Sequence, residues 1–431
     1  MISCPESTFS HDPLLVCCRL CRLSFFCAFL GWFALAPLMP VIKPSLGLSD
    51  DDVYTANITS VLMTVFARFA VGPLCDEYGP RILQTGLLTW GGIACGLCPL
   101  INNAGSLITL RLFVGVVGST FVCTQYWGSQ LFVGELVGTA QATSGGWGNL
   151  GGGVTQLFMP VMFEAMKAAG APEDRAWRLA LIFPAVFLLI IAALLFTYAK
   201  DSPRGNYKDL VAAGVKQKVT ATKSAKEGFA DPATWVLFLQ YACCFGVELT
   251  VNNTMTSYFV NKFGLGLVTA GTIAMCFGLM NIFARACGGM LSDYLESQYK
   301  MKGRLVAQGV CLFFEGIMLM IFSRMNTVPS AVVMLICFSI FVQSSEGTTY
   351  AIVPYVVPDA TGAVSGVVGA GGNCGAVIWG LIFLLSGMDA SDCYLTIGII
   401  VLCSSLLTPF IWIKGPHNGI FCNPRMTLEV K

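Results

Sequence analysis

Long apolar segments separated by short polar ones are the most regular feature of the chain. Two of the clearest are 178–199 and 393–413, and each is long enough to cross a hydrocarbon layer of roughly 30 Å as a helix. Apolar windows of this kind predict twelve membrane-spanning helices, at 23–42, 55–74, 82–101, 107–127, 138–163, 178–199, 233–259, 268–291, 305–325, 330–356, 363–387 and 393–413. The pattern therefore predicts an all-α protein that crosses a lipid bilayer many times.

Two short motifs repeat on either side of the one long hydrophilic stretch, 200–232. FARFAVGPLCD (66–76) matches FARACGGMLSD (283–293) at an offset of 217 residues, and GNLG (148–151) matches GNCG (372–375) at an offset of 224. These repeats predict two pseudo-symmetric six-helix bundles, 23–199 and 233–413, joined by a linker (200–232) and flanked by tails (1–22 and 414–431). Duplicated bundles of this kind hold a substrate site between the halves near the middle of the membrane.

Composition agrees with many membrane spans. Of the 431 residues, 55% are hydrophobic and only 11% are charged, whereas about a quarter of the residues of a soluble domain are charged. The formal net charge of +1 gives no reason to expect a nucleic-acid partner. The partner that the composition indicates is the lipid bilayer.

Basic residues set the orientation of the spans, because cytoplasmic loops are enriched in Lys and Arg. The linker contains seven of them. Others fall on the linker side of the membrane: Arg19, Arg22, Arg81, Lys300, Lys302 and Arg304. The opposite side has fewer: Lys43, Lys167, Arg175, Arg178, Lys262 and Arg324. Both termini and the linker are therefore predicted to be cytoplasmic.

The sequence offers little for an enzyme or a metal site. The two histidines, His11 and His417, lie in the predicted tails, and no nucleophile–base constellation accompanies them. The nineteen cysteines lie mostly in apolar stretches, where a free cysteine behaves as a small hydrophobic residue. We expect no enzymatic activity, no catalytic residue, no metal and no cofactor.

Arg68 and Arg285 are the most informative residues of the spans. Each lies eight residues before an Asp that ends its span on the cytoplasmic side, Asp76 or Asp293, which corresponds to about 12 Å of helix. Both arginines therefore lie near the middle of the bilayer, where an uncompensated arginine costs roughly 3 kcal/mol or more.

Two interpretations of these arginines are open. In the first, each forms a structural ion pair with an acidic residue of the spans, of which three are candidates: Glu248, Glu315 and Glu346. In the second, which their equivalent places in the two halves favour, both face one central cavity and bind the substrate. Guanidinium groups are planar and permanently charged, and they donate paired hydrogen bonds to planar oxyanions such as nitrate, nitrite or a carboxylate.

Polar and aromatic side chains at the same depth are further candidates for the site. Asn149 and Asn373 lie near the middle of their spans, within glycine-rich stretches, and a buried amide needs hydrogen-bond partners, which an anion can be. The glycines recur at the small-residue spacing that lets helices pack closely. Tyr241, Phe245 and Glu248 share one helix face, either as part of the cavity or as part of the protein core.

A separate group lies at the cytoplasmic ends of the spans. Asp76 and Arg81 of GPLCDEYGPR can pair and hold neighbouring helices in one conformation, and Asp293 with Arg304 gives a similar combination in the second half. We assign these residues to gating rather than to substrate contact, with helix capping as the alternative.

Some of these motifs resemble those of a transporter superfamily. The pattern G-x-L-x-D-x-x-G-x-R at 72–81 resembles the loop signature of the major facilitator superfamily. Arg111 with Gly115 and Gly118 resembles a second motif of that superfamily. The resemblance implies a fold of twelve transmembrane helices in two bundles.

Other stretches resemble a narrower group. The segments 145–160 and 366–380, combined with the two arginines, resemble the nitrate/nitrite porter family, whose glycine-rich stretches are called nitrate signatures. The segments 239–253 and 346–356 resemble its eukaryotic branch in plants and algae. The resemblance implies a high-affinity transporter of nitrate, and of nitrite, that works by alternating access.

The same resemblance implies roles for individual residues. The family holds nitrate between two arginines with aromatic rings above and below it, which by position are Arg68, Arg285, Tyr241, Phe245 and Phe121, together with Asn149. It also implies proton symport, for which Glu248, Glu346 and Glu315 are the candidate carriers, with Glu248 the first choice because it shares a helix face with Tyr241. Two alternatives are a nitrate/nitrite exchanger without proton coupling and a nitrate-binding sensor.

We further expect a monomer in the plasma membrane, with an internal membrane as the alternative location. Some plant relatives require a small accessory membrane protein, which is therefore a candidate partner of this chain.

Overall fold

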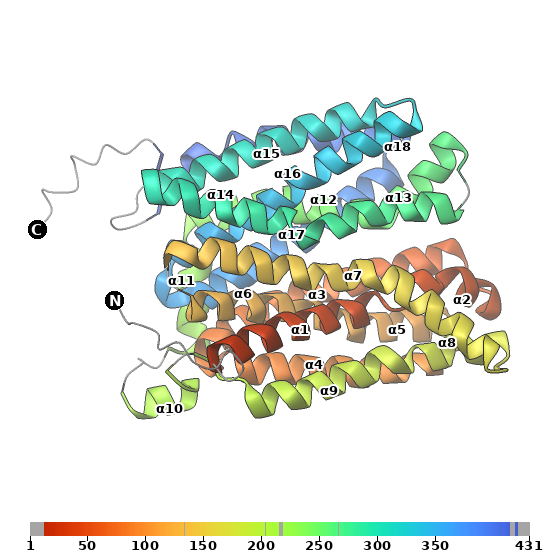
Figure 1. The fold of residues 1–431 in the computed structure, drawn as a ribbon, viewed down its shortest axis with the longest axis horizontal. Helices are drawn as coiled ribbons and strands as arrows, with labels where there is room; N and C mark the ends of the chain where they lie inside the picture. The colour runs from red at the N-terminus through yellow and green to blue at the C-terminus, as the bar shows by residue number, and fades with distance from the viewer. Residues whose placement is uncertain are drawn as a thin grey trace, which may run out of the picture.

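The computed structural model describes residues 13–132, 134–202, 204–214, 219–265, 267–413 and 419–420. In these ranges the chain forms two bundles of long helices, which lie one above the other in Figure 1.

The N-terminal bundle consists of α1 (Pro13–Phe33), α2 (Met39–Leu46), α3 (Asp50–Tyr78), α4 (Pro80–Leu97), α5 (Ala104–Gly115), α6 (Thr120–Leu131), α7 (Val137–Ala168), α8 (Glu173–Ala180) and α9 (Ile182–Tyr198). The C-terminal bundle consists of α12 (Pro232–Phe263), α13 (Leu267–Leu279), α14 (Ala284–Tyr299), α15 (Met301–Ser323), α16 (Val328–Val356), α17 (Thr361–Leu385) and α18 (Ala390–Ser405). The linker forms two short helices, α10 (Tyr207–Ala212) and α11 (Ala221–Ala230), at one end of the molecule.

The predicted all-α membrane fold is confirmed. Eleven segments of the described chain are long and apolar enough to cross a membrane. The remaining predicted span corresponds to α7, whose 32 residues include many glycines and polar side chains. Such residues are tolerated there because α7 is covered by protein: it packs against α1 of its own bundle and against α14 and α16 of the other.

The first span differs from its prediction. The helix α1 ends at Phe33, whereas the apolar window predicts a span over 23–42. Prolines explain the difference: Pro37, Pro40 and Pro44 follow α1, and the chain forms a short 3₁₀ turn and the eight-residue α2 there. Proline lacks an N–H donor and disfavours a continuous helix, although its apolar ring adds to a hydropathy window.

The next long helix, α3, begins earlier than predicted. It starts at Asp50 because Ser49 and Asp52 form a capping box, in which each side chain accepts a hydrogen bond from the other residue's main-chain N–H. The whole helix runs to Tyr78, and it carries Arg68 close to its middle.

Two spans are interrupted near the arginines. The 3₁₀ turn Val116–Ser119 separates α5 from α6, and the 3₁₀ turn Met280–Ile282 separates α13 from α14, just before Arg285. Each interruption breaks the regular hydrogen-bond pattern of the helix, which leaves main-chain groups available for other partners.

The two bundles meet along two equivalent seams. Along one seam α3 packs against α17, and along the other α14 packs against α7. A Cβ atom added to Gly72 of α3 would collide with the main chain of Gly362, and one added to Gly289 of α14 would collide with that of Gly138. The equivalence of these contacts shows that the sequence repeat is also a structural repeat.

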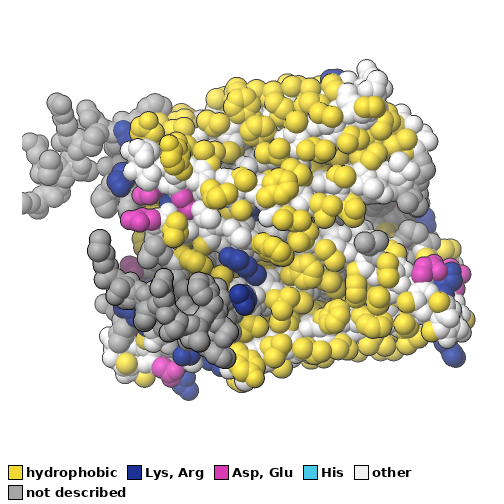
Figure 2. Space-filling model, in the orientation of Figure 1, with side chains coloured by type: hydrophobic (Ala, Val, Ile, Leu, Met, Phe, Trp, Pro, Cys, Tyr) yellow, Lys and Arg dark blue, Asp and Glu magenta, His cyan; other side chains and the backbone are white. Residues whose placement is uncertain are grey.

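The outer surface agrees with a lipid environment. In Figure 2 hydrophobic side chains cover most of the middle of the visible face, while most charged side chains gather toward its two ends. Exposed large apolar residues include Ile93 on α4 and Phe187, Ile190 and Phe196 on α9. The protein is therefore a multi-pass membrane protein.

Candidate substrate-binding site

Arg68 is held by neutral groups. Its side chain is fully buried, and its Nε and Nη2 donate to the main-chain carbonyl of Gly118 at 3.2 and 3.0 Å. Its Nη1 donates to the carbonyl of Gly369 in α17 at 2.5 Å. The Gly118 carbonyl belongs to the turn between α5 and α6, so this interruption supplies an acceptor for the arginine.

Arg285 has a charged partner. It forms an ion pair with Glu346 of α16, and both side chains are 0% exposed. Its Nη2 donates to the hydroxyl of Tyr241 at 3.0 Å, while its Nε has no hydrogen-bond partner within the described residues. The structural ion pair that was one interpretation of the arginines is thus present for Arg285, whereas the described contacts of Arg68 are to carbonyls and rings.

Three aromatic rings gather around the guanidinium groups. The Cζ atoms of Arg68 and Arg285 lie 4.8 and 5.5 Å from the centroid of the Phe121 ring. Phe245 stacks on Phe121 at 6.0 Å and lies 5.4 Å from the Cζ of Arg68. Tyr241 in turn stacks on Phe245 at 5.3 Å. Cation–π contacts of this kind stabilise a desolvated cation. The three rings that lie together here are the three that were expected from the sequence.

Each arginine faces a glycine of the other bundle. A Cβ atom added to Gly145 of α7 would lie 2.7 Å from the Nε of Arg285, and one added to Gly369 of α17 would lie 3.6 Å from the Cδ of Arg68. These two glycines have the spacing of the repeated GNLG and GNCG motifs. The glycine-rich stretches therefore make room for the side chains of the site, in addition to letting helices pack closely.

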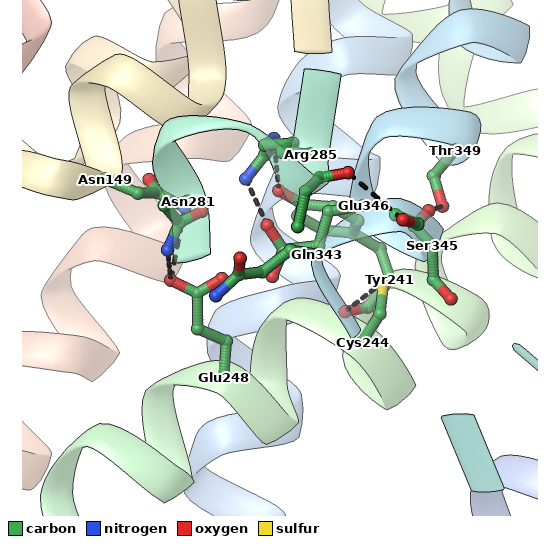
Figure 3. A network of polar contacts seen from close by, with 12 residues as sticks. Asn149, Tyr241, Cys244, Glu248, Asn281, Arg285, Gln343, Ser345, Glu346 and Thr349 are labelled. Carbon is green, nitrogen blue, oxygen red and sulfur yellow. Dashed lines mark hydrogen bonds and ion pairs between the residues drawn. The ribbon is translucent and has the colours of Figure 1, made fainter. Parts of the chain in front are cut away.

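Glu248 lies in a cluster with two amides (Figure 3). Its Oε1 accepts hydrogen bonds from the Nδ2 of Asn281 at 2.9 Å and from that of Asn149 at 3.5 Å. Asn149 comes from α7 and Glu248 from α12, so the cluster joins the two bundles. Its remaining oxygens, the Oε2 of Glu248 and the Oδ1 atoms of both amides, are buried and have no partner within the described residues.

Asn373 and Glu315 are also fully buried. Asn373 lies one helical turn beyond Gly369 on α17, and Glu315 lies on α15. The side-chain oxygen and nitrogen of Asn373 have no hydrogen-bond partner in the part of the chain that the structure describes, and the carboxyl group of Glu315 faces the hydroxyl of Ser345. The buried region thus contains several polar atoms that water or a ligand can satisfy.

Asp76 and Asp293 connect the bundles at the linker end of the two seams. The carboxylate of Asp76 accepts hydrogen bonds from the main-chain N–H groups of Gly362 and Ala363, at 3.1 and 3.0 Å. The carboxylate of Asp293 accepts from those of Gly138 and Thr139, at 3.1 and 2.6 Å. Each aspartate therefore caps the first turn of a helix that belongs to the opposite bundle, a place where a negative charge is favourable.

The expected pairing of aspartate and arginine holds in only one half. Arg304 donates to Asp293 at 2.7 Å. The guanidinium of Arg81 instead donates to the carbonyl of Phe196 at 2.7 Å, and the Asp76–Arg81 pair is not formed in this conformation. The reason is local: Gly79, with φ of +84°, ends α3 and turns the chain so that Arg81 lies at the start of α4.

Two residues of the site are not among the sequence predictions. Tyr350 packs its ring edge-on against Phe121 at 4.9 Å and against Tyr241 at 5.1 Å, and Asn281 binds Glu248 as described. Tyr350 has a signal in hindsight, because it lies four residues after Glu346 on α16, whereas Asn281 lies in the 3₁₀ turn before α14 and has no such signal. Side chains at that spacing lie on one face of a helix.

The fold and this buried cationic site define a class of protein. The sequence model of the Major Facilitator Superfamily matches residues 23–380, so the chain belongs to that superfamily of transporters. The solved structure of the proton:xylose symporter XylE has the same fold, with a TM-score of 0.70 at 13% identity, over 94% of this chain and 97% of that one.

Sequence relatives define the group within the superfamily. The chain is 37% identical to high affinity nitrate transporter 2.5 of Arabidopsis thaliana, over 94% of this chain and 81% of the relative. It is 34% identical to nitrate transporter 2.2 of Chlamydomonas reinhardtii, over 95% of this chain and 83% of the relative. The resemblance to the plant and algal branch of the nitrate porters is thereby confirmed.

Proposed function

We propose that the protein transports nitrate, and nitrite, and that it holds the anion between Arg68 and Arg285. The observation that carries the proposal is the environment of Arg68, a fully buried cation whose described hydrogen-bond partners are neutral carbonyls. A planar oxyanion complements such a group, because it accepts paired hydrogen bonds and neutralises the charge. The names of the relatives support nitrate as that anion.

The surrounding side chains suit a small planar anion. The rings of Phe121, Phe245 and Tyr241 exclude water, and the low local dielectric strengthens the attraction between the anion and the guanidinium groups. Asn149 and Asn373 are the proposed amide contacts of the anion. Asn149 is already hydrogen-bonded to Glu248 at 3.5 Å, so we propose that it exchanges this weak contact for one with the substrate.

We propose transport by alternating access, with Asp76 and Asp293 as parts of the cytoplasmic gate. Each carboxylate joins one bundle to the first turn of a helix in the other, so both contacts must break before the site opens to the cytoplasm. Arg304 stabilises Asp293 in the closed arrangement. Arg81 belongs to the gate as a residue that orients the start of α4, through its contacts with Phe196 and Asp201.

The proposal also includes proton coupling. The import of one negative charge against an inside-negative potential costs about 2.3 kcal/mol per 100 mV, and protons that enter with the anion offset this cost. Among the three candidate carboxyl groups, Glu346 is best placed to carry the proton, since it is paired with the Arg285 guanidinium to which the anion would bind. An anion that displaces Glu346 leaves a buried carboxylate without its cation, and protonation removes that unfavourable charge. Nitrate binding and proton binding then favour one another.

Glu248 and Glu315 remain second candidates for the proton. Glu248 faces two amides rather than a cation, so the arrival of an anion at Arg285 changes its hydrogen bonds less than those of Glu346. Glu315 is fully buried on α15, where its carboxyl group faces the hydroxyl of Ser345 rather than a cation.

The proposal includes an orientation and a location. The linker and both termini lie on the cytoplasmic side, because the linker carries seven Lys and Arg residues and cytoplasmic loops are enriched in them. The plasma membrane is the proposed location, the monomer is the proposed functional unit, and a small accessory membrane protein is a candidate partner.

Labelled nitrate uptake in cells that lack their own nitrate transporters tests the proposal. Lysine keeps the charge of arginine but loses its planar fork, so Arg68→Lys and Arg285→Lys are expected to abolish uptake at normal surface levels. Uptake by the unmodified protein is expected to require an inward proton gradient. Normal uptake by both lysine variants would show that the arginines are structural and would remove the substrate assignment.

The same assay distinguishes the two alternatives. Uptake that ignores the proton gradient but increases with nitrite inside the cell identifies an exchanger. Nitrate binding to the purified protein without measurable uptake identifies a sensor. Either result contradicts proton-coupled transport.

A further inference from the structure

Besides Arg304, which pairs with Asp293 alone, the two cytoplasmic seams differ in the source of one hydroxyl donor. At the α7 seam, Asp293 accepts from two main-chain N–H groups and also from the hydroxyl of Thr139, at 2.6 Å. At the α17 seam, Asp76 accepts from the two equivalent N–H groups, those of Gly362 and Ala363. By the offset of 224 residues Ala363 corresponds to Thr139, and alanine has no hydroxyl group.

The linker supplies the hydroxyl that α17 lacks. Ser224 of α11 is fully buried, and its Oγ donates to the Oδ2 of Asp76 at 2.5 Å. The same oxygen accepts from the N–H of Ala363 at 3.0 Å. Asp76 therefore accepts from two N–H groups of α17 and from a hydroxyl that comes from outside both bundles, with the hydroxyl of Tyr126 of α6 also facing it. Asp293 has the guanidinium of Arg304 in addition to its two N–H groups and its hydroxyl.

The helix α11 contacts both sides of the seam. Its first residue, Ala221, donates its N–H to the Oε2 of Glu77 in α3 at 2.7 Å, and Phe229 packs against Phe69 of α3 with ring centroids 5.5 Å apart. On the α17 side, a Cβ atom added to Gly228 would lie 2.7 Å from the Cβ of Ala363. The linker helix is thus fixed to α3 and packed against the first turn of α17 at the same time.

We propose that α11 is a working part of the cytoplasmic gate, in which Ser224 stabilises the conformation closed to the cytoplasm. The proposal rests on alternating access as the proposed mode of transport. The three donors meet at Asp76 only when α3 and α17 are together, so the Ser224 hydrogen bond favours closure and must break, or move with Asp76, when the bundles separate. A hydrogen bond to a charged group changes such an equilibrium by about tenfold.

The Ser224→Ala variant tests the proposal through the sidedness of transport. Loss of the hydroxyl favours the conformation open to the cytoplasm, so the apparent affinity for external nitrate should fall several-fold while that for internal nitrate rises. Influx and efflux of labelled nitrate in vesicles of defined orientation measure the two values. Thr222→Ala, on the exposed side of the same helix, is the matched control and should change neither.

A second variant tests the correspondence with the other seam. Ala363→Ser, introduced together with Ser224→Ala, returns a hydroxyl to the position that Thr139 occupies in α7, and should restore both apparent affinities. Ser224→Asp puts a second negative charge beside Asp76 and should shift both affinities further in the direction of Ser224→Ala.

Hydrogen–deuterium exchange gives a readout that does not depend on nitrate. The N–H groups of Gly362 and Ala363 are bonded to Asp76, so a peptide covering 361–365 should exchange faster in Ser224→Ala than in Thr222→Ala. Unchanged affinities and unchanged exchange would overturn the role of α11. A parallel fall of both affinities would also overturn it, because it indicates general damage. If the substrate is not nitrate, transport fails for all variants but the exchange result still decides the proposal.

Discussion

Gly145 of the N-terminal bundle and Arg285 of the C-terminal bundle lie so close together that a Cβ atom on the glycine would be 2.7 Å from the Nε of the arginine. The arginine has little freedom to move away, because Glu346 and Tyr241 hold the other end of its guanidinium group. The glycine is therefore part of the site, although its own side chain contributes no chemistry.

This relationship predicts a strong effect of Gly145→Ala. The methyl group forces Arg285 from its partners, and overpacking of a buried site typically costs about 1–3 kcal/mol. We expect nitrate uptake to fall by roughly tenfold at equal surface level. Gly153→Ala on the same helix is the control, since its Cβ would meet no heavy atom closer than 4.0 Å. Equal uptake by the two variants would contradict the role of Gly145.

The sequence predicts much of this site because charge and depth are local properties. An arginine at the middle of an apolar span needs a partner wherever the fold puts it, so Arg68 and Arg285 are found without a structure. Their partners depend on tertiary contacts: the carbonyl of Gly118 is available through a 3₁₀ turn, and Arg81 faces away from Asp76 through the turn at Gly79. Neither feature has a signature in hydropathy or in motif spacing.

The fold likewise has features that the sequence predicts and features that only the structure reveals. Eleven of the twelve predicted spans follow from apolar length, whereas the early end of α1 depends on three prolines that a hydropathy window counts as apolar. The capping box of Ser49 and Asp52 that starts α3 is visible in the sequence as a local pattern. The contacts of α11 with α3 and α17 are long-range and come only from the structure.

Glu346→Gln should separate nitrate binding from proton coupling. The amide has nearly the shape of the carboxyl group but takes up no proton and does not compete with an anion for Arg285. We expect nitrate binding to be kept or strengthened and uptake to lose its dependence on the proton gradient. Binding to purified protein and uptake with and without a pH gradient measure the two effects. Gradient-driven uptake at the normal rate would exclude Glu346 as the coupling group, and Glu315→Gln and Glu248→Gln would then be compared in the same way.

Phe121→Leu should weaken nitrate binding without removing it. The ring lies within 5.5 Å of the Cζ atoms of both arginines, and each cation–π contact contributes about 1 kcal/mol. Loss of both, about 2 kcal/mol, predicts an affinity for nitrate lower by roughly thirtyfold. Phe187→Leu, at a side chain that is 40% exposed on α9, is the control for the change of residue type. An unaltered affinity would show that Phe121 only fills space.

Arg304 and Arg81 should differ in importance, although their motifs look alike. Removal of Arg304 leaves Asp293 with one partner fewer in a buried pair, and such a loss costs about 3–5 kcal/mol. Arg81 donates to a carbonyl near the surface, so Arg81→Ala should cost only about 1 kcal/mol. Thermal unfolding of the purified variants measures both effects. Equal losses would mean that Arg81 has a closer connection with Asp76 than this conformation contains.

The repeated backbone carries an unequal distribution of charge, and this inequality bears on the direction of transport. The carbonyl groups around Arg68 are uncharged at every pH, so its attraction for an anion is the same on both sides of the membrane. Arg285 is instead paired with the carboxyl group of Glu346. Under the proposed proton coupling, the strength of this second contact depends on the acidity of whichever compartment the site faces. An anion that enters from the more acidic compartment meets two available cations, and in the less acidic one it meets a competitor for one of them. In the proposed mechanism, a single carboxyl group thus gives a duplicated and nearly symmetric scaffold a preferred direction.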